Sequence, residues 1–252
     1  DANRDTLNDL GHGINYIPTY TFHSSLMGET PTDNWFVSVS GEDSLPDLFL
    51  GRVPVRTQAE LDAVVNKLFR YPQVPLDGWQ RQVLFVTDDE PKFDEVSERL
   101  IEQYLGDLVP KRVYLGEYAE GEVEVVTQDI IDAIDAGAVV TNYTGHGSLN
   151  LWAGEDIFNF GDVALLDNPD KFTFVVALNC QNGLFSYSQP FRGTSDSFAE
   201  VFLKADGKGA IGMFAPSGLG YSTEHEVLAG ELFGRLFREN VTELGFLTTA
   251  AK

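Results

Sequence analysis

The chain has little cysteine and little positive charge, and each of these features excludes some classes of site or partner. It contains one cysteine, Cys180, so no intrachain disulfide can form, and metal or cluster sites built from four thiolates are excluded. Its 252 residues include 17 Lys and Arg against 39 Asp and Glu, a net charge of −22 at pH 7. Such a surface repels a phosphate backbone, so we expect no nucleic-acid partner. Carboxylates do suit Ca²⁺, but a solvated acidic surface is the plainer interpretation.

Long hydrophobic runs are also missing. The longest apolar runs, such as Phe172 to Leu178, have the length of a strand and are too short to cross a bilayer. The polar start, Asp1 to Asp9, does not resemble a signal peptide. We therefore expect no membrane span, and the 43% of hydrophobic residues are enough for a sizeable core.

Short β-rich runs alternate with amphipathic helical stretches, which predicts an α/β fold with a mostly parallel sheet. Several of the β-rich runs are almost wholly apolar, as expected for strands that are covered on both faces. The predicted strands are Trp35 to Ser40, Val83 to Thr87, Arg112 to Leu115, Ala138 to Tyr143, Phe172 to Leu178 and Ala210 to Phe214. The predicted helices are Thr57 to Arg70, Asp94 to Leu105, Thr127 to Ala136, Thr194 to Lys204 and Thr223 to Arg238, the first and last with a capping box.

A linker rich in proline and glycine, Arg70 to Gln80, separates two parts of the chain. We predict that residues 1–75 form the C-terminal part of a first α/β subdomain and residues 76–252 a catalytic α/β subdomain. Both ends look cut, because the first strand-like run has no partner before it and Gly245 to Lys252 resembles a continuing helix.

Two predicted strands end in small polar loops that each carry a reactive side chain. One strand runs into Thr144-Gly145-His146-Gly147-Ser148, and another into Asn179-Cys180-Gln181-Asn182-Gly183. The carboxyl ends of parallel strands share one edge of a sheet, so neighbouring strands would bring His146 and Cys180 together. Their separation of 34 positions leaves room for one crossover connection.

A thiol beside an imidazole is the arrangement of a cysteine nucleophile. The imidazole can hold the thiolate and protonate the leaving amine, and the amides of Gly147 and Cys180 can donate to a developing oxyanion. Each motif taken alone is weak, since a strand-end cysteine is more often a packing residue than a nucleophile. The residues alone therefore leave an inert core cysteine and a catalytic one as open alternatives.

The two motifs resemble those of a known family. Asn142 to Ser148 with Trp152 resembles the histidine motif of the gingipain family of cysteine peptidases, and Ala177 to Gly183 its cysteine motif. Ser40 to Asp43 and Leu48 to Val53 are similar to its hairpin and Gly-Arg strand, so the likeness runs from about Leu10 to Lys252. The resemblance implies a caspase-like (caspase–hemoglobinase) three-layer α/β/α fold with two subdomains, apparently truncated at both ends.

Carried over by position, the resemblance implies an endopeptidase that works through a thioacyl-enzyme. Its nucleophile is Cys180 and its general acid–base His146, with Glu90 orienting the histidine and Gly147 and Cys180 forming the oxyanion hole. A preference for a basic residue before the cleaved bond is implied by Asp94, at the base of the substrate pocket. Surface carboxylates are the competing interpretation of Glu90 and Asp94. The implied pocket walls are Thr144, Gly145, Leu178 and Tyr221.

The expected partners are protein or peptide substrates and further domains of the same precursor. No cofactor is required for the chemistry, while Asp88-Asp89-Glu90 makes a structural Ca²⁺ conceivable. The resemblance also implies secretion or a cell-surface location. Two alternatives remain open: a non-hydrolytic surface or scaffold module that keeps the fold, and a sortase-like transpeptidase with the same Cys-His pair.

Overall fold

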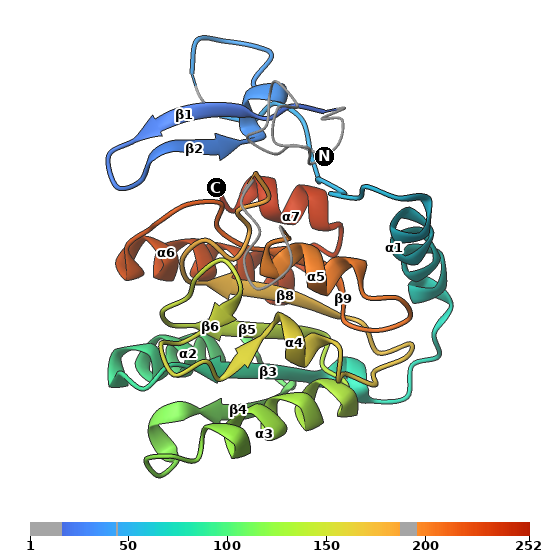
Figure 1. Ribbon diagram of the computed structural model, residues 1–252, viewed down its shortest axis with the longest axis vertical. Coiled ribbons are helices and arrows are strands. Elements are labelled where there is room, and N and C mark those ends of the chain that lie inside the picture. Colours follow the sequence, from blue (N-terminus) through green and yellow to red (C-terminus); the bar gives the residue numbers. More distant parts are fainter. Residues whose placement is uncertain (1–16, 44, 187–195) are drawn as a thin grey trace.

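A five-stranded parallel sheet forms the centre of the molecule (Figure 1). The structure is a computed structural model that describes residues 17–43, 45–186 and 196–252. Within the sheet the strands follow the order β4-β3-β5-β8-β9, and each neighbouring pair is parallel. The strands are β3 (Gln82–Thr87), β4 (Val109–Tyr114), β5 (Val140–Thr144), β8 (Thr173–Leu178) and β9 (Ala210–Phe214). The five later predicted strands are therefore confirmed.

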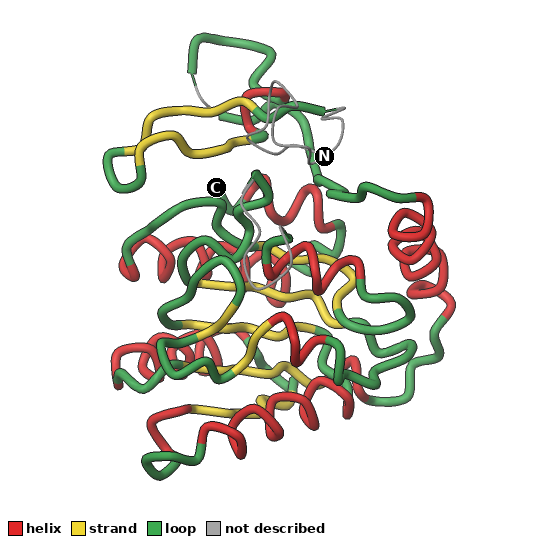
Figure 2. The backbone as a smooth tube through the Cα atoms, in the orientation of Figure 1, coloured by secondary structure: helices red, strands yellow, loops and turns green. Residues whose placement is uncertain are grey.

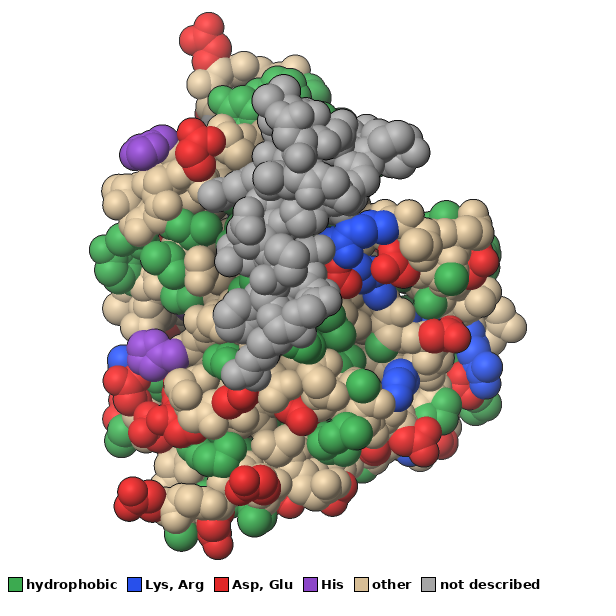
Figure 3. All heavy atoms as spheres, viewed as in Figure 1, with side chains coloured by type: hydrophobic (Ala, Val, Ile, Leu, Met, Phe, Trp, Pro, Cys, Tyr) green, Lys and Arg blue, Asp and Glu red, His purple; other side chains and the backbone are tan. Residues whose placement is uncertain are grey.

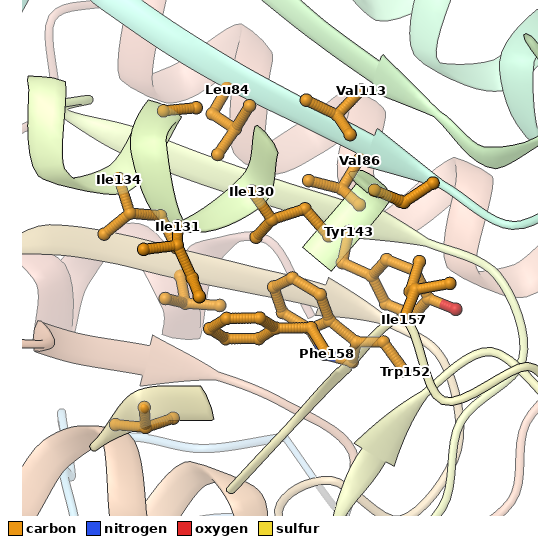
Figure 4. Close-up of a cluster of buried hydrophobic side chains, with 14 of the residues drawn as sticks. Leu84, Val86, Val113, Ile130, Ile131, Ile134, Tyr143, Trp152, Ile157 and Phe158 are labelled. Atoms are coloured by element: carbon orange, nitrogen blue, oxygen red, sulfur yellow. The ribbon is translucent and has the colours of Figure 1, made fainter. Parts of the chain in front are cut away.

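Helices cover both faces of this sheet. On one face pack α2 (Pro91–Tyr104), α6 (Ser222–Phe233) and α7 (Leu244–Ala250), and on the other α3 (Val123–Ala136), α4 (Phe160–Val163) and α5 (Phe198–Lys204). The core on the α3 side includes Leu84, Ile130 and Trp152 (Figure 4). Strands buried on both faces explain why β5 and β8 have no exposed residue. The predicted three-layer α/β/α fold is confirmed.

Side-chain caps mark where several helices begin. Thr57 caps α1 (Gln58–Arg70), Asn159 caps α4 and Ser197 caps α5, each in a capping box. The capping box predicted at Thr223 is wrong, because α6 begins at Ser222 and its first residues receive no side-chain cap. Thr194, the predicted start of α5, lies outside the described residues.

The first part of the chain differs most from the sequence prediction. Strands β1 (Tyr20–Ser24) and β2 (Gly28–Thr32) form an antiparallel hairpin that lies apart from the central sheet (Figure 2). The strand predicted at Trp35 to Ser40 is wrong, because residues 34–36 form a 3-10 turn in which Trp35 stacks on Tyr20. The hairpin and Gly-Arg strand expected at 40–43 and 48–53 are likewise not strands in the described part of the chain.

Helix α1 connects this first part to the sheet. It packs against α5 and β9, and its Lys67 donates hydrogen bonds to the carbonyls of Leu203, Lys208 and Ala210 at 2.7–3.0 Å. The predicted linker that follows contains two 3-10 turns, and Trp79 within it is buried. The subdomain boundary between residues 75 and 76 stays a prediction.

The surface reflects the composition. Asp and Glu side chains are spread over the lower part of the face in Figure 3. No helix in the described ranges is long and apolar enough to span a bilayer.

Candidate active site

The pairing of β5 with β8 places the two reactive residues at equivalent positions. Thr144 pairs with Leu178 at the carboxyl ends of these strands, and the amide of Gly145 still donates to the Leu178 carbonyl at 3.3 Å. His146 and Cys180 each lie two residues beyond this last pair. The predicted neighbourhood of the two strands, and hence of the two loops, is present in the structure.

The backbone of His146 is held from two sides. Its amide donates to Oδ2 of Asp88 at 2.8 Å, and its carbonyl accepts from the hydroxyl of Tyr143 at 2.5 Å. The same hydroxyl accepts from the amide of Ala153 at 2.8 Å. Asp88 and Tyr143 are buried, so water does not compete for these bonds. The imidazole itself is 65% exposed, and Phe93 meets it edge-on at 5.6 Å.

Neighbouring atoms leave no room for a side chain at either of the two glycines beside His146. A Cβ on Gly145 would lie 2.5 Å from Cβ of Asp88 and 2.6 Å from the Tyr143 hydroxyl. A Cβ on Gly147 would lie 2.2 Å from Nδ2 of Asn179. Any larger residue would therefore displace the loop from the positions that Asp88 and Asn179 impose.

The Cys180 loop is fixed by the segment after β9. The amide of Gln181 donates to Gly218 and that of Gly183 to Pro216, both at 2.9 Å. Gln181 has a positive φ of 61°, which marks a sharp turn directly after the cysteine. The Cys180 thiol is partly buried and points to the carbonyl of Gly220 at 3.9 Å.

Two amides in these loops have no acceptor among the described residues. Among the hydrogen bonds between described residues, none uses the N–H of Gly147 or of Cys180. No hydrogen bond joins the thiol to the imidazole within the same part of the chain either. Catalytic hydrogen bonds are often long before substrate binds, so this separation does not argue against a dyad.

Glu90 lies where the sequence prediction needs it. Its Oε2 atom is 3.1 Å from Nε2 of His146 and accepts from Lys92 at the same distance. The Lys92 ammonium holds the pKa of the Glu90 carboxyl below its usual range, and His146 contributes less to that lowering. Glu90 therefore stays ionised next to the imidazole, although both side chains are exposed.

Asp94 is bonded to the end of β3. Its carboxylate accepts from the hydroxyl of Thr87 at 2.5 Å, and burial raises its pKa. The other charges that raise that pKa are Glu117 and Glu98, which lie after β4 and on α2. Asp94 thus faces the β3–β4 side of the sheet, whereas Cys180 follows β8.

The remaining predicted pocket residues differ in their position and burial. Thr144 and Leu178 are buried strand ends, and Gly145 begins the histidine loop. Tyr221 is 58% exposed and directly precedes α6. A cavity of about 570 Å³ lies behind the Cys180 loop, and Leu178 is the one predicted pocket residue in its lining.

Two residues whose side chains bond to the backbone of the histidine loop were not identified from the sequence. In the sequence Asp88 stands out only as part of an acidic cluster. A polar residue directly after a buried strand is, however, itself a signal of a site residue. Asn182 belongs to the cysteine motif, but the contacts of its buried amide could not be deduced from spacing.

No group of three or more His, Cys, Asp or Glu side chains converges to hold a metal ion in the described ranges. Asp88 accepts from backbone amides and Glu90 faces His146. The structural Ca²⁺ stays a prediction.

Comparisons with known proteins identify related peptidases. Gingipain R2 and gingipain R1 of Porphyromonas gingivalis are each 27% identical to the chain over 209 residues. That alignment covers 79% of this chain but 27% and 20% of those two proteins, so the chain spans about a quarter of their length.

Solved structures show the same fold. The crystal structure of the Arg-specific cysteine proteinase gingipain R (RgpB) superposes with a TM-score of 0.73 and 22% identity, over 93% of this chain and 55% of that one. The complex of the RgpB pro- and mature domains gives 0.72 and 22%, over 88% and 54%. The caspase-like fold that the resemblance implied is thereby confirmed. The sequence model of peptidase family C25 matches residues 1–252, so the chain belongs to peptidase family C25.

Proposed function

We propose that this chain carries the active site of a cysteine endopeptidase with Cys180 as the nucleophile and His146 as the general acid–base. The β5–β8 register carries the proposal, because it gives the thiol and the imidazole matching positions beyond two paired strands. Membership of a peptidase family supports the same chemistry. The intact residue pair argues against a scaffold, which needs neither side chain.

The reaction needs one proton carrier and one nucleophile. Nε2 of His146 is hydrogen-bonded to Glu90. Nδ1 is therefore the nitrogen that would accept the thiol proton. The thiolate of Cys180 then adds to the scissile carbonyl carbon, and the imidazolium returns the proton to the leaving amine as the C–N bond breaks. Water, activated by the same imidazole, hydrolyses the thioester and frees Cys180.

The backbone amides of Gly147 and Cys180 would stabilise the negative charge that develops on the substrate oxygen. The N–H groups of Gly147 and Cys180 lack acceptors among the described residues, so both are available to the oxyanion of the tetrahedral intermediate. Because Asp88 and Tyr143 hold the histidine loop before substrate arrives, the Gly147 amide needs little reorganisation. Glu90 would orient the imidazole through its bond to Nε2.

For specificity, we propose a preference for a basic residue before the cleaved bond. The similar RgpB is named as Arg-specific, and this chain has a net charge of −22. Thr144, Gly145, Leu178 and Tyr221 would form the walls of the pocket. Asp94 is the candidate acidic residue, and its Oδ1 accepts from the hydroxyl of Thr87, which leaves Oδ2 as the oxygen that would bind an arginine.

A peptide library with mass-spectrometric detection of the products tests the proposal. Cys180→Ala and His146→Ala should each abolish cleavage, while His23→Ala, an exposed histidine on β1, should cleave like the wild type. Cleavage by Cys180→Ala would reject the mechanism. An Asp94→Asn variant that keeps full preference for arginine would reject Asp94 as the specificity residue.

The same assay separates hydrolysis from acyl transfer. In the presence of a primary amine a transpeptidase gives mainly the amide product, whereas an endopeptidase gives mainly the free acid. We propose hydrolysis, and a predominance of the amide product would identify the transpeptidase.

The natural setting is part of the proposal. A secreted or cell-surface location rests on the resemblance to gingipains, and protein substrates follow from the peptidase family. Further domains of the same precursor are the expected partners, as the solved complex of RgpB pro- and mature domains illustrates for that protein. Detection of the native protein in the cytoplasmic fraction alone would contradict the location.

A further inference from the structure

The side chain of Asn182 uses all of its hydrogen-bonding capacity between the two catalytic loops. Its amide nitrogen donates to the carbonyls of Ser148 at 2.5 Å and Leu151 at 3.3 Å. Its amide oxygen accepts from Nε1 of Trp152 at 2.8 Å and from Nδ2 of Asn179 at 2.6 Å. An amide has two donors and two acceptor lone pairs, so this group is completely satisfied.

These contacts join segments that are distant in sequence. Ser148 lies two residues after His146, and Asn182 lies two residues after Cys180. Leu151 and Trp152 form β6, whose hairpin with β7 (Phe158–Asn159) closes the histidine loop, since Trp152 bridges to Gly147. One side chain thus connects the cysteine loop with the histidine loop and its supporting hairpin.

Burial strengthens the hydrogen bonds that Asn182 makes between the two loops. Asn179 and Asn182 are almost completely buried, so water does not replace their partners. Asn179 also lies directly beneath Gly147, where a Cβ would be 2.2 Å from its Nδ2. The backbone carbonyl of Asn182 accepts from the amide of Ala199, which attaches the loop to α5.

We infer that Asn182 is a positioning residue that fixes the cysteine loop relative to the histidine loop. It touches neither reacting atom, and it acts through the backbone of Ser148 and Leu151. The inference rests on the proposed function, because it assigns Asn182 a role in the Cys180–His146 pair. Loss of this side chain would let the loops move relative to each other, and a misplacement of about 1 Å can cost about 100-fold in rate.

Asn168 offers a matched control. It is also fully buried, and its amide bonds to Lys171 and Gly209 at 2.8–3.1 Å. It precedes β8, at the amino end of the strand, and therefore lies away from the catalytic loops. Asn168→Ala and Asn182→Ala remove the same group from similar environments, so both should lower the melting temperature.

The experiment measures reactivity at Cys180, which is the chain's single cysteine. Wild type, His146→Ala, Asn182→Ala and Asn168→Ala are alkylated with iodoacetamide at pH 6 and pH 9, and peptide turnover gives kcat and KM. A thiolate held by the imidazole reacts at pH 6, so the ratio of the two rates reports the pairing. Trp152→Phe, which removes one of the four bonds, repeats the test if Asn182→Ala does not fold.

Asn182→Ala should lower kcat about 100-fold with KM changed less than about 3-fold, and its rate ratio should approach that of His146→Ala. Asn168→Ala should keep the wild-type ratio and kcat at temperatures where it is folded. Trp152→Phe should shift both quantities in the same direction by a smaller factor. If Asn182→Ala kept the wild-type rate ratio and kcat, the inference about Asn182 would be overturned while the proposed dyad would stand. The same would follow if Asn168→Ala lost as much as Asn182→Ala. Equal ratios in wild type and His146→Ala would reject the proposed dyad instead.

Discussion

Oε2 of Glu90 lies 3.1 Å from Nε2 of His146 and equally far from Nζ of Lys92. The carboxylate is thus shared between the imidazole and a lysine in the first turn of α2, the helix that Glu90 precedes. Both members of the Glu90–His146 pair are exposed, so solvent and salt screen the pair and its contribution is small.

Glu90→Gln should therefore lower kcat/KM by no more than about 5-fold, because it removes the charge but keeps an acceptor. Steady-state kinetics with a single peptide measures the effect. Glu95→Gln, an exposed position on α2, is the control and should leave kcat/KM unchanged. A loss near that of His146→Ala would mean that Glu90 has a direct part in proton transfer.

Asp88 is expected to matter for both stability and catalysis. Asp88→Ala leaves the partly buried amide of His146 without the buried carboxylate that it bonds to, which should cost about 1 kcal/mol and lower kcat. Asp88→Asn keeps one of the two acceptor oxygens and should lose less of both. Burial raises the pKa of this carboxyl, so its charge is itself unfavourable in the folded state. Urea unfolding and peptide turnover check the order, and equal losses in the two variants would contradict it.

Gly147→Ala should damage the site, whereas Gly154→Ala should not. The new methyl group at position 147 would collide with Asn179, which is buried and bonded to Asn182. We expect a destabilisation of about 1–3 kcal/mol and a large loss of kcat. No heavy atom lies within 4 Å of a Cβ placed on Gly154, so that substitution is the control. Activity of Gly147→Ala close to that of Gly154→Ala would show that the histidine loop is not fixed in this way.

Glu200 should make stability depend on pH. Burial raises its pKa from 4.5 to about 7, against the opposing effect of Lys204, and Asp196 raises it further. The folded state therefore binds this proton more tightly than the unfolded chain. Its stabilisation is complete below pH 4.5 and is lost as pH rises to about 7.

The free energy of unfolding of the wild type relative to Glu200→Gln should fall by about 3 kcal/mol between pH 4.5 and 7.5. Urea titrations at four pH values measure this difference. A difference that is constant with pH would contradict the buried, proton-binding state of Glu200.

The central sheet could be predicted from the sequence because its strands are continuous apolar runs. Val83 to Thr87 and Phe172 to Leu178 are buried on both faces, and their runs of four and five consecutive apolar residues are typical of such strands. The spacing left room for one crossover between β5 and β8, and the pairing of these strands in the structure means that the His146 and Cys180 loops follow neighbouring strand ends. The first part of the chain was predicted less well. Trp35 to Ser40 has strand-forming residues but pairs with no strand in the described part of the chain, and the Trp35 ring stacks on Tyr20 of the hairpin instead.

The supporting contacts of the site could not be predicted in the same way. Asp88 and Asn182 act through bonds to backbone groups of a loop 34 or more residues away, and spacing contains no signal for such bonds. Glu90 was located from the resemblance, and the structure adds its sharing with Lys92. Asp94 was also located from the resemblance, and the structure adds its bond to Thr87, so its role in the substrate pocket stays a prediction.

The most direct test of the account is the intact mass of the protein after labelling with an acyloxymethyl-ketone peptide that carries arginine. Lysine and aspartate analogues, and the variants His146→Ala and His23→Ala, are treated in parallel. The account predicts one adduct on Cys180 with the arginine probe, present in His23→Ala and absent in His146→Ala. A folded wild-type chain that gives no adduct with any probe, or the same adduct in His146→Ala, would contradict the proposed dyad.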